Sequence, residues 1–243
     1  MLTPDALRAA DARIRQLVDS IYVDKSGRAE AIYDGVIDVD QYCKSPCRIL
    51  WVLKEPWDEP NSSGGGWSLA DALREKPVSA HSPPTFHPII YIAYGLFNKV
   101  TAWSDIPDVS AMKNPESILH QIAFINAKKL PGVTRGAYAP SIMEWFSKGK
   151  EIVMEQIATY APEIVFGCSP HFPAILDALQ SGWRSEARSV GSAVHVWHQN
   201  TLFVHVYHPG QTQISWESYV EDALNAVSQA RQQKALANQA PKT

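Results

Sequence analysis

Short runs of consecutive apolar residues alternate with longer amphipathic segments along the chain. A run of about four to eight apolar residues is typical of a strand buried on both faces, as in a parallel sheet covered by helices. The last two runs flank the short turn Gln199–Thr201, across which they could pair as neighbouring strands. The predicted strands are Ile49–Leu53, Ile122–Asn126, Pro162–Cys168, Val194–His198 and Leu202–Tyr207.

Apolar residues at helical spacing predict helices before, between and after these strands. Thr3 is a candidate N-cap followed by Pro4, which predicts a helix over about residues 4–20. An i, i+3, i+4, i+7 stripe after the candidate N-cap Ser215 predicts a last helix over about residues 215–237. Further helices are expected at 67–73, 89–100, 114–121, 140–160 (in one or two pieces) and 171–180, and irregular segments at 57–66, 77–88 and 127–138. Residues 21–46 are mixed and are expected to contain short turns or an edge strand.

Strands that alternate with helices predict an α/β fold with a mostly parallel sheet and helices on both of its faces. At 243 residues, the chain is long enough for one large domain with a substantial core. Neither an internal repeat nor a linker divides the sequence. Residues 1–243 are therefore expected to form a single domain.

The composition, with 45% apolar and 19% charged residues, is ordinary for a globular protein. A net charge of −3 supplies no overall basic field, which argues against tight non-specific DNA binding but permits a small local footprint. Three cysteines do not make a disulfide framework, and Cys43 and Cys47 lack the second pair that a closed metal site needs. Without a signal peptide or a bilayer-spanning run, the protein is expected to be cytoplasmic, with no membrane partner.

Three predicted strands are closely followed by, or end in, polar residues competent for chemistry. Glu55 follows the first strand, Asn126 ends the second and His208 follows the last. In an open α/β sheet, ligands bind at the carboxyl ends of the strands, so parallel neighbours would bring these side chains together. A carboxylate, an amide and an imidazole could recognise a planar polar ligand. The alternative is that they are a solvated turn acid, a strand-terminal cap and a turn residue before proline.

Basic residues follow the first two predicted strands. Lys54, Lys128, Lys129 and Arg135 could form a local phosphate-binding patch beside the site. The alternative is a solvated charged rim without a ligand.

Taken together, these segments resemble the uracil-DNA glycosylase superfamily over about residues 48–226. Arg48–Trp57 is similar to the first motif of that family, a buried strand that runs into a polar-acid-Pro-aromatic turn. Ile122–Asn126 is similar to the strand that ends in the base-reading asparagine, and Tyr207–Gly210 to the His-Pro-Ser motif. Pro162–Gly167 resembles the strand before the last part of the fold, and the order and rough spacing of the motifs agree.

The resemblance implies a three-layer sandwich with a central, mostly parallel four-stranded sheet, and a protein that acts without a cofactor on DNA or on a nucleobase or nucleotide. In base excision repair, Glu55 would orient water and stabilise the cationic sugar while the N-glycosidic bond of a flipped uracil or damaged base is hydrolysed. Asn126 would bind the Watson–Crick edge of the base, and His208 would donate a hydrogen bond to a base carbonyl. Trp67 lies about where the family has an aromatic residue that stacks on the base, and Trp57 where some members shape the pocket.

Several positions depart from the pattern of the family. Leu53-Lys54 replaces the glycine that opens the first motif, and Glu55 is one methylene longer than the usual aspartate. Gly210-Gln211-Thr212 lacks the serine that contacts a phosphate, no leucine wedge follows, and the four-cysteine cluster of some branches is missing from the sequence. These departures favour an alternative function, a non-catalytic base- or nucleotide-binding module of the same fold.

The histidines suggest a third function. His195, His198, His205 and His208 form two His-x-x-His pairs on adjacent predicted strands, and such density could bind zinc or another metal in a hydrolase. Residues three apart on a strand point to opposite faces, however, so both members of a pair cannot easily reach one metal. A metal-dependent hydrolase is therefore the weaker alternative, and no residue is assigned as a metal ligand.

Overall fold

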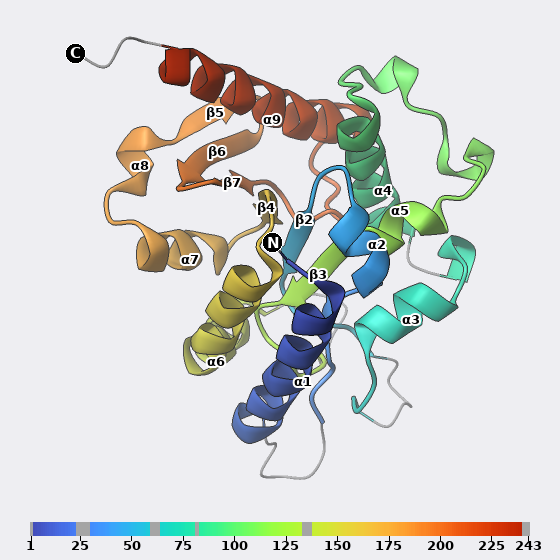
Figure 1. Ribbon diagram of the computed structural model, residues 1–243, viewed down its shortest axis with the longest axis vertical. Coiled ribbons are helices and arrows are strands. Elements are labelled where there is room, and N and C mark those ends of the chain that lie inside the picture. Colours follow the sequence, from blue (N-terminus) through green and yellow to red (C-terminus); the bar gives the residue numbers. More distant parts are fainter. Residues whose placement is uncertain (1, 23–29, 59–63, 81–82, 133–137, 240–243) are drawn as a thin grey trace.

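The strands form one seven-stranded sheet, in the order β1-β3-β2-β4-β7-β6-β5 (Figure 1). Four central strands are parallel to one another: β3 (Ile122–Asn126), β2 (Ile49–Leu53), β4 (Ile164–Gly167) and β7 (Thr201–His205). Three outer strands run antiparallel to their inner neighbours: β1 (Gly35–Val36), β6 (Ala193–His198) and β5 (Arg188–Val190). This computed structural model describes residues 2–22, 30–58, 64–80, 83–132 and 138–239.

The predicted α/β class is confirmed, but the prediction of a four-stranded sheet is wrong in its size. β1, β6 and β5 extend the sheet at its two ends. β1 and β5 contain two and three residues, too few to show a period in the sequence. The predicted pairing across the turn at Gln199 is confirmed, because β6 and β7 form a hairpin in which His198 lies opposite Thr201.

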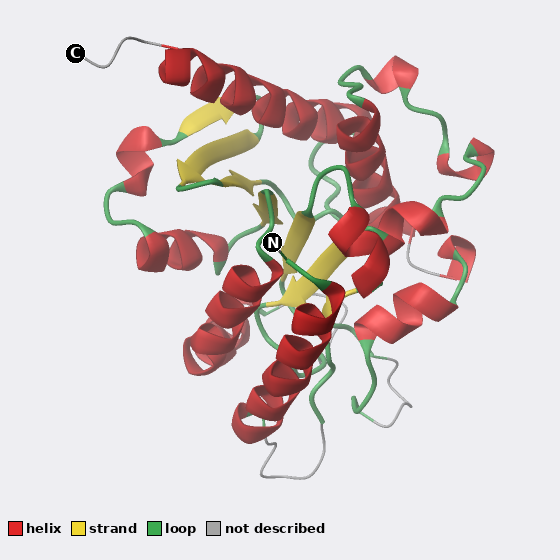
Figure 2. Cartoon of the chain, in the orientation of Figure 1, coloured by secondary structure: helices red, strands yellow, loops and turns green. Residues whose placement is uncertain are grey.

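Helices cover both faces of the sheet (Figure 2), because successive side chains of a buried strand point to opposite faces. In β2, Trp51 packs into one apolar core and Val52 into the other. The first core is covered by α3 (Leu69–Glu75), α4 (Pro83–Asn98), α5 (Glu116–His120) and α9 (Trp216–Gln239). The second is covered by α1 (Pro4–Ile21), α2 (Val39–Lys44), α6 (Ala139–Tyr160), α7 (Phe172–Leu179) and α8 (Trp183–Glu186). Connections include the 3₁₀ helices η1 (Val78–Ala80), η2 (Trp103–Asp105) and η3 (Val109–Ala111).

The predicted first and last helices are confirmed as α1 and α9. α1 begins at the predicted residue, and the other helix ends differ from their predicted bounds by one or two residues. The hydroxyl of Thr3 accepts a hydrogen bond from the N–H of Ala6 at 3.3 Å. The hydroxyl of Ser215 accepts one from the N–H of Ser218 at 3.1 Å. Both caps satisfy N–H groups that have no acceptor within their own helix.

Two segments for which no helix was predicted contain helices. α2 lies within residues 21–46, where the carboxylate of Asp38 caps it by accepting from the N–H of Gln41 at 3.0 Å. α4 begins at Pro83, within residues 77–88, and includes three prolines. Pro83 and Pro84 are tolerated in the first turn because the N–H groups there have no intrahelical acceptor, whereas Pro88 lies inside the helix. The proline content therefore predicted an irregular segment where a helix begins.

α6 is one helix and passes through Gly149 without a break. A Cβ atom at Gly149 would lie 2.1 Å from the hydroxyl oxygen of Tyr22, so this glycine permits a close approach of the segment after α1. In the described ranges, no helix is both long and apolar enough to cross a membrane.

The register of the parallel strands brings their carboxyl ends to one edge of the sheet. Leu53 pairs with Asn126, Val52 with Gly167, and Gly167 with His205. The segments that follow these positions therefore leave the sheet side by side. This edge is where open α/β sheets bind their ligands.

Candidate functional site

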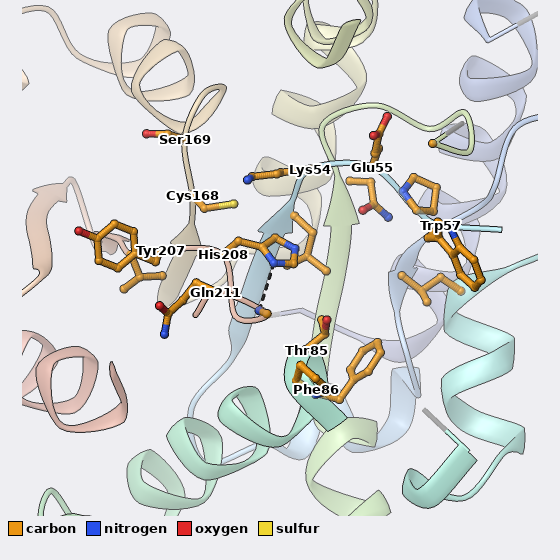
Figure 3. Close-up of a pocket in the computed structure, with 18 of the residues that line it drawn as sticks. Lys54, Glu55, Trp57, Thr85, Phe86, Cys168, Ser169, Tyr207, His208 and Gln211 are labelled. Atoms are coloured by element: carbon orange, nitrogen blue, oxygen red, sulfur yellow. Dashed lines mark hydrogen bonds between the residues drawn. The ribbon is translucent and has the colours of Figure 1, made fainter. Parts of the chain in front are cut away.

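A pocket of about 1390 Å³ opens at the carboxyl ends of β2, β3, β4 and β7. Figure 3 shows the residues after β2 on one part of its wall and those after β4 and β7 on another. The pocket brings together six side chains that the sequence predicted to share a site: Lys54, Glu55, Trp57, Trp67, Asn126 and His208.

Glu55 is held at the wall of the pocket by an ion pair. Its Oε2 lies 2.6 Å from Nζ of Lys128, and the two side chains are only 8% and 7% exposed. A Cβ atom at Gly132 would lie 2.8 Å from Oε1 of Glu55, so the chain passes close behind the carboxylate. The geometry does not support the predicted phosphate contact of Lys128, because its ammonium is buried and already neutralises this carboxylate.

Asn126 ends β3 with its side chain buried and oriented by Asp34, a residue that precedes β1. Oδ2 of Asp34 accepts hydrogen bonds from the backbone N–H of Asn126 at 2.6 Å and from its side-chain Nδ2 at 3.3 Å. The sequence analysis missed Asp34. The only signal was an acid beside an apolar Gly35–Ile37 segment that could serve as an edge strand.

Lys129 is buried and does not line the pocket. Its side chain is fully buried, with Nζ 2.7 Å from Oδ1 of Asp34 and 2.8 Å from Oε1 of Gln156 on α6. Burial lowers the pKa of Lys129, and the charge of Asp34 opposes that shift. The geometry does not support the predicted phosphate contact of Lys129, because its ammonium is inaccessible to an external anion.

Lys54 is the member of the predicted phosphate patch that lines the pocket. Among the described residues, its ammonium has no hydrogen-bond or ion-pair partner. Arg135, the remaining member, lies outside the described residues. Of the predicted patch, Lys54 is therefore the lysine that lines the pocket, and Lys76, which the sequence analysis did not single out, lines it as well.

His208 projects into the pocket from the segment after β7 (Figure 3). Burial, with a smaller contribution from the charge of Lys54, lowers the pKa of His208 to about 4. Its Nδ1 accepts a hydrogen bond from the backbone N–H of Gly210 at 3.1 Å. A neutral imidazole that accepts at Nδ1 carries its proton on Nε2. His208 can therefore donate one hydrogen bond without carrying a charge.

Aromatic rings form further parts of the wall. Trp67 and Trp57 line the pocket, and Trp57 is 44% exposed. Phe86, which the sequence analysis missed, lies on the first turns of α4 and also lines it. Phe86 packs edge-on against Phe124 of β3, with ring centroids 5.8 Å apart. Because residues 77–88 were expected to be irregular, nothing placed Phe86 beside the strand ends.

The segment after β4 adds two residues that the sequence analysis passed over, Cys168 and Ser169. Oγ of Ser169 lies 2.9 Å from Nε2 of His205, whose ring stacks on Phe172 with centroids 5.8 Å apart. The signal was available, since Cys168 ends a predicted strand as Asn126 does, and Ser169 follows it. They lie at the same edge because β4 is parallel to β2 and β7.

The arrangement of the described histidines does not support a metal site. Val194 pairs with His205 and His195 with Val204, so His195 and His205 lie on opposite faces of the β6–β7 hairpin. His198 interacts instead with Gln180. In the part of the chain that the structure describes, no three His, Cys, Asp or Glu side chains are grouped to hold a metal ion.

The buried histidines predict that stability falls in mild acid. Burial lowers the pKa of His208 to about 4 and that of His171 to about 3, whereas an unfolded histidine titrates near 6.5. As the pH falls below about 6.5, the unfolded chain binds protons that the folded protein does not, so folding becomes less favourable. For each of these histidines, lowering the pH from 7.5 to 5 should reduce the free energy of unfolding by roughly 2 kcal/mol.

Urea unfolding at pH 7.5 and pH 5 measures this loss. The variant His208→Gln should lose less stability between the two pH values than the wild type, because glutamine does not titrate. Equal stability of the wild type at both pH values would contradict a neutral, buried state of these histidines.

No protein-family model matches the chain, and a search of curated proteins also gives no match. The chemistry of the pocket is therefore argued from its own residues.

Proposed function

We propose that the protein binds a nucleobase in this pocket and hydrolyses its N-glycosidic bond, as a uracil-DNA glycosylase-like enzyme acting on DNA. The observation that carries the proposal is the presence of Glu55, Asn126 and His208 around one pocket. The resemblance between the sequence motifs and that superfamily supports it further. The order β3-β2-β4-β7 of four parallel strands, with helices on both faces, is consistent with the three-layer core that the resemblance implies.

In this proposal, the base is bound by hydrogen bonds at its edge and by rings at its face. Asn126 offers an amide, which can donate and accept at neighbouring positions. Trp67 and Phe86 supply apolar surfaces that a flipped base can stack on. Lys54 could meet one phosphate of the attached strand, a small footprint that a net charge of −3 does not oppose.

The bond-breaking step needs stabilisation of both products of heterolysis. Nε2–H of His208 would donate to the carbonyl oxygen of the departing base and stabilise the negative charge that develops there. Glu55 would orient the attacking water. Oε2 of Glu55 is bound to Lys128, whereas Oε1 accepts no hydrogen bond from the described residues. Oε1 is therefore the atom that can accept a proton from water.

One observation favours a second candidate function, a non-catalytic base-binding module. The ion pair with Lys128 already compensates the charge of Glu55, which weakens the electrostatic help that Glu55 could give to a cationic sugar. The amide, the rings and the histidine donor would still bind a base.

Single- and double-stranded oligonucleotides that contain uracil, or one of a panel of damaged bases, test both functions. We expect the wild type to generate abasic sites with at least one of them and Asn126→Ala to lose that product. Asn98→Ala is the matched control, because Asn98 is an exposed amide on α4 whose one hydrogen bond to a described residue is to its own helix. Base binding without turnover would favour the binding module. Neither binding nor turnover across the panel would reject both functions.

A further inference from the structure

Asp34 is the central acceptor of a buried polar network that includes the pocket residue Asn126. Its carboxylate accepts hydrogen bonds from the backbone and side chain of Asn126, from Nζ of Lys129 and from Nε2 of Gln156. The side chains of Asp34 and Lys129 are 1% and 0% exposed. Gln156 Oε1 in turn accepts from Lys129 at 2.8 Å, so the groups around the carboxylate are tied to one another as well.

The donors around Asp34 determine which way the amide of Asn126 points. Among the described residues, every polar group that contacts the carboxylate donates to it, so its oxygens act as acceptors and the amide atom beside Oδ2 must be Nδ2. Rotation of the amide by a half-turn would place Oδ1 of Asn126 against Oδ2 of Asp34, two acceptors with no proton between them. Asp34 therefore opposes the flipped amide.

The remaining edge of the amide is then defined. Oδ2 of Asp34 accepts both the backbone N–H and the Nδ2 of the same residue, Asn126. The Nδ2 proton that can reach back toward the backbone is the one anti to Oδ1. The other Nδ2 proton and Oδ1 point the same way, away from Asp34, and form an adjacent donor and acceptor.

We propose that Asp34 is a specificity-determining positioning residue. By holding the amide of Asn126 in one orientation, it makes the pocket accept bases that carry a ring N–H beside a carbonyl, as uracil does. Bases that carry a ring acceptor beside an amino donor, as cytosine does, are rejected. This inference rests on the proposed function. An acceptor beside a donor matches N–H beside C=O, whereas cytosine offers a ring nitrogen acceptor beside an amino group. Since the sugar fixes the direction from which a base enters, a fixed amide would leave both groups of cytosine unpaired, which is costly in a buried site.

The test compares uracil with cytosine, in oligonucleotides for excision and as free bases for binding. The double variant Asp34→Asn/Lys129→Met removes both buried charges and leaves an amide that can pair with either orientation of Asn126. In the double variant, we expect the preference for uracil over cytosine, measured as the ratio of excision rates or of affinities for the free bases, to fall by roughly tenfold or more. Tyr160→Phe is the matched control. The hydroxyl of Tyr160 bonds to Asp11 and Gln156 in the same network but to neither Asp34 nor Asn126, so the ratio should not change.

A measurement without ligand keeps the inference testable if the double variant does not fold. In the wild type, the Nδ2 proton of Asn126 that binds Asp34 should exchange with solvent more slowly than its partner, as NMR of the side-chain amide can measure. Equal exchange of the two protons, or an unchanged base ratio in a folded double variant, would overturn the role of Asp34 while leaving the proposed function intact. A wild type that neither binds nor excises either base would reject the proposed function, and this inference with it.

Discussion

Replacement of Lys129 by methionine is expected to lower the free energy of unfolding by about 3–5 kcal/mol. Methionine fills nearly the same volume, so the loss comes from charge rather than from a cavity. The carboxylate of Asp34, 1% exposed and 2.7 Å from the ammonium, would remain buried without its counter-ion. Removal of one partner of a buried ion pair lowers the free energy of unfolding far more than removal of both partners.

Urea unfolding at pH 7, followed by circular dichroism, measures this effect. Lys148→Met is the matched control, because Lys148 pairs with Glu144 on the exposed face of α6, where solvent screens the interaction. The control should unfold at nearly the wild-type urea concentration. The double variant Asp34→Asn/Lys129→Met should regain much of the stability that Lys129→Met loses. If Lys129→Met were as stable as the control, the ion pair would not contribute as its burial indicates.

Replacement of His208 by alanine is expected to reduce kcat for base excision by 10²–10³-fold, the usual effect of removing one hydrogen-bond donor from a developing oxyanion. KM should change little, since the bond between Nε2–H and the base carbonyl strengthens mainly as charge develops. Because burial lowers the pKa of His208 to about 4, the imidazole stays neutral down to about pH 5. The histidine should therefore cause no fall in kcat between pH 8 and pH 5.

Single-turnover excision rates across this pH range measure both effects. His198→Ala is the control, because His198 lies on β6 and interacts with Gln180 outside the pocket. An excision rate for His208→Ala equal to that of the control would exclude His208 as the donor. A wild-type rate that falls between pH 7 and pH 6 and becomes level in the alanine variant would show instead that His208 titrates near its ordinary pKa.

The elements that local sequence determines were predicted well. α1 and α9 follow from an apolar stripe and a capping hydroxyl at Thr3 and Ser215, both of which act within a few residues. The buried strands β2 and β3 follow from unbroken apolar runs. Alternation of such strands with helices implies parallel pairing, and parallel pairing brings Glu55, Asn126 and His208 to one pocket.

Some elements were predicted only loosely or not at all. β1 lies where the sequence allowed either short turns or an edge strand, and its two residues are too few to place it. β5 has only three residues and lacks a readable period, and the prolines of α4 resemble those of a loop. The position of Phe86 in the pocket depended on α4, so it was missed with the start of that helix.

The sequence by itself determined which side chains end the central strands, since apolar runs and their polar ends are local features of the chain. Only the tertiary structure decided what surrounds each one. Lys128 and Lys129 look alike in sequence, yet one neutralises Glu55 at the pocket wall and the other is buried against Asp34, 95 residues away along the chain. Burial and charge pairing depend on segments that are distant in sequence, so no local pattern separates a phosphate-binding lysine from a structural one.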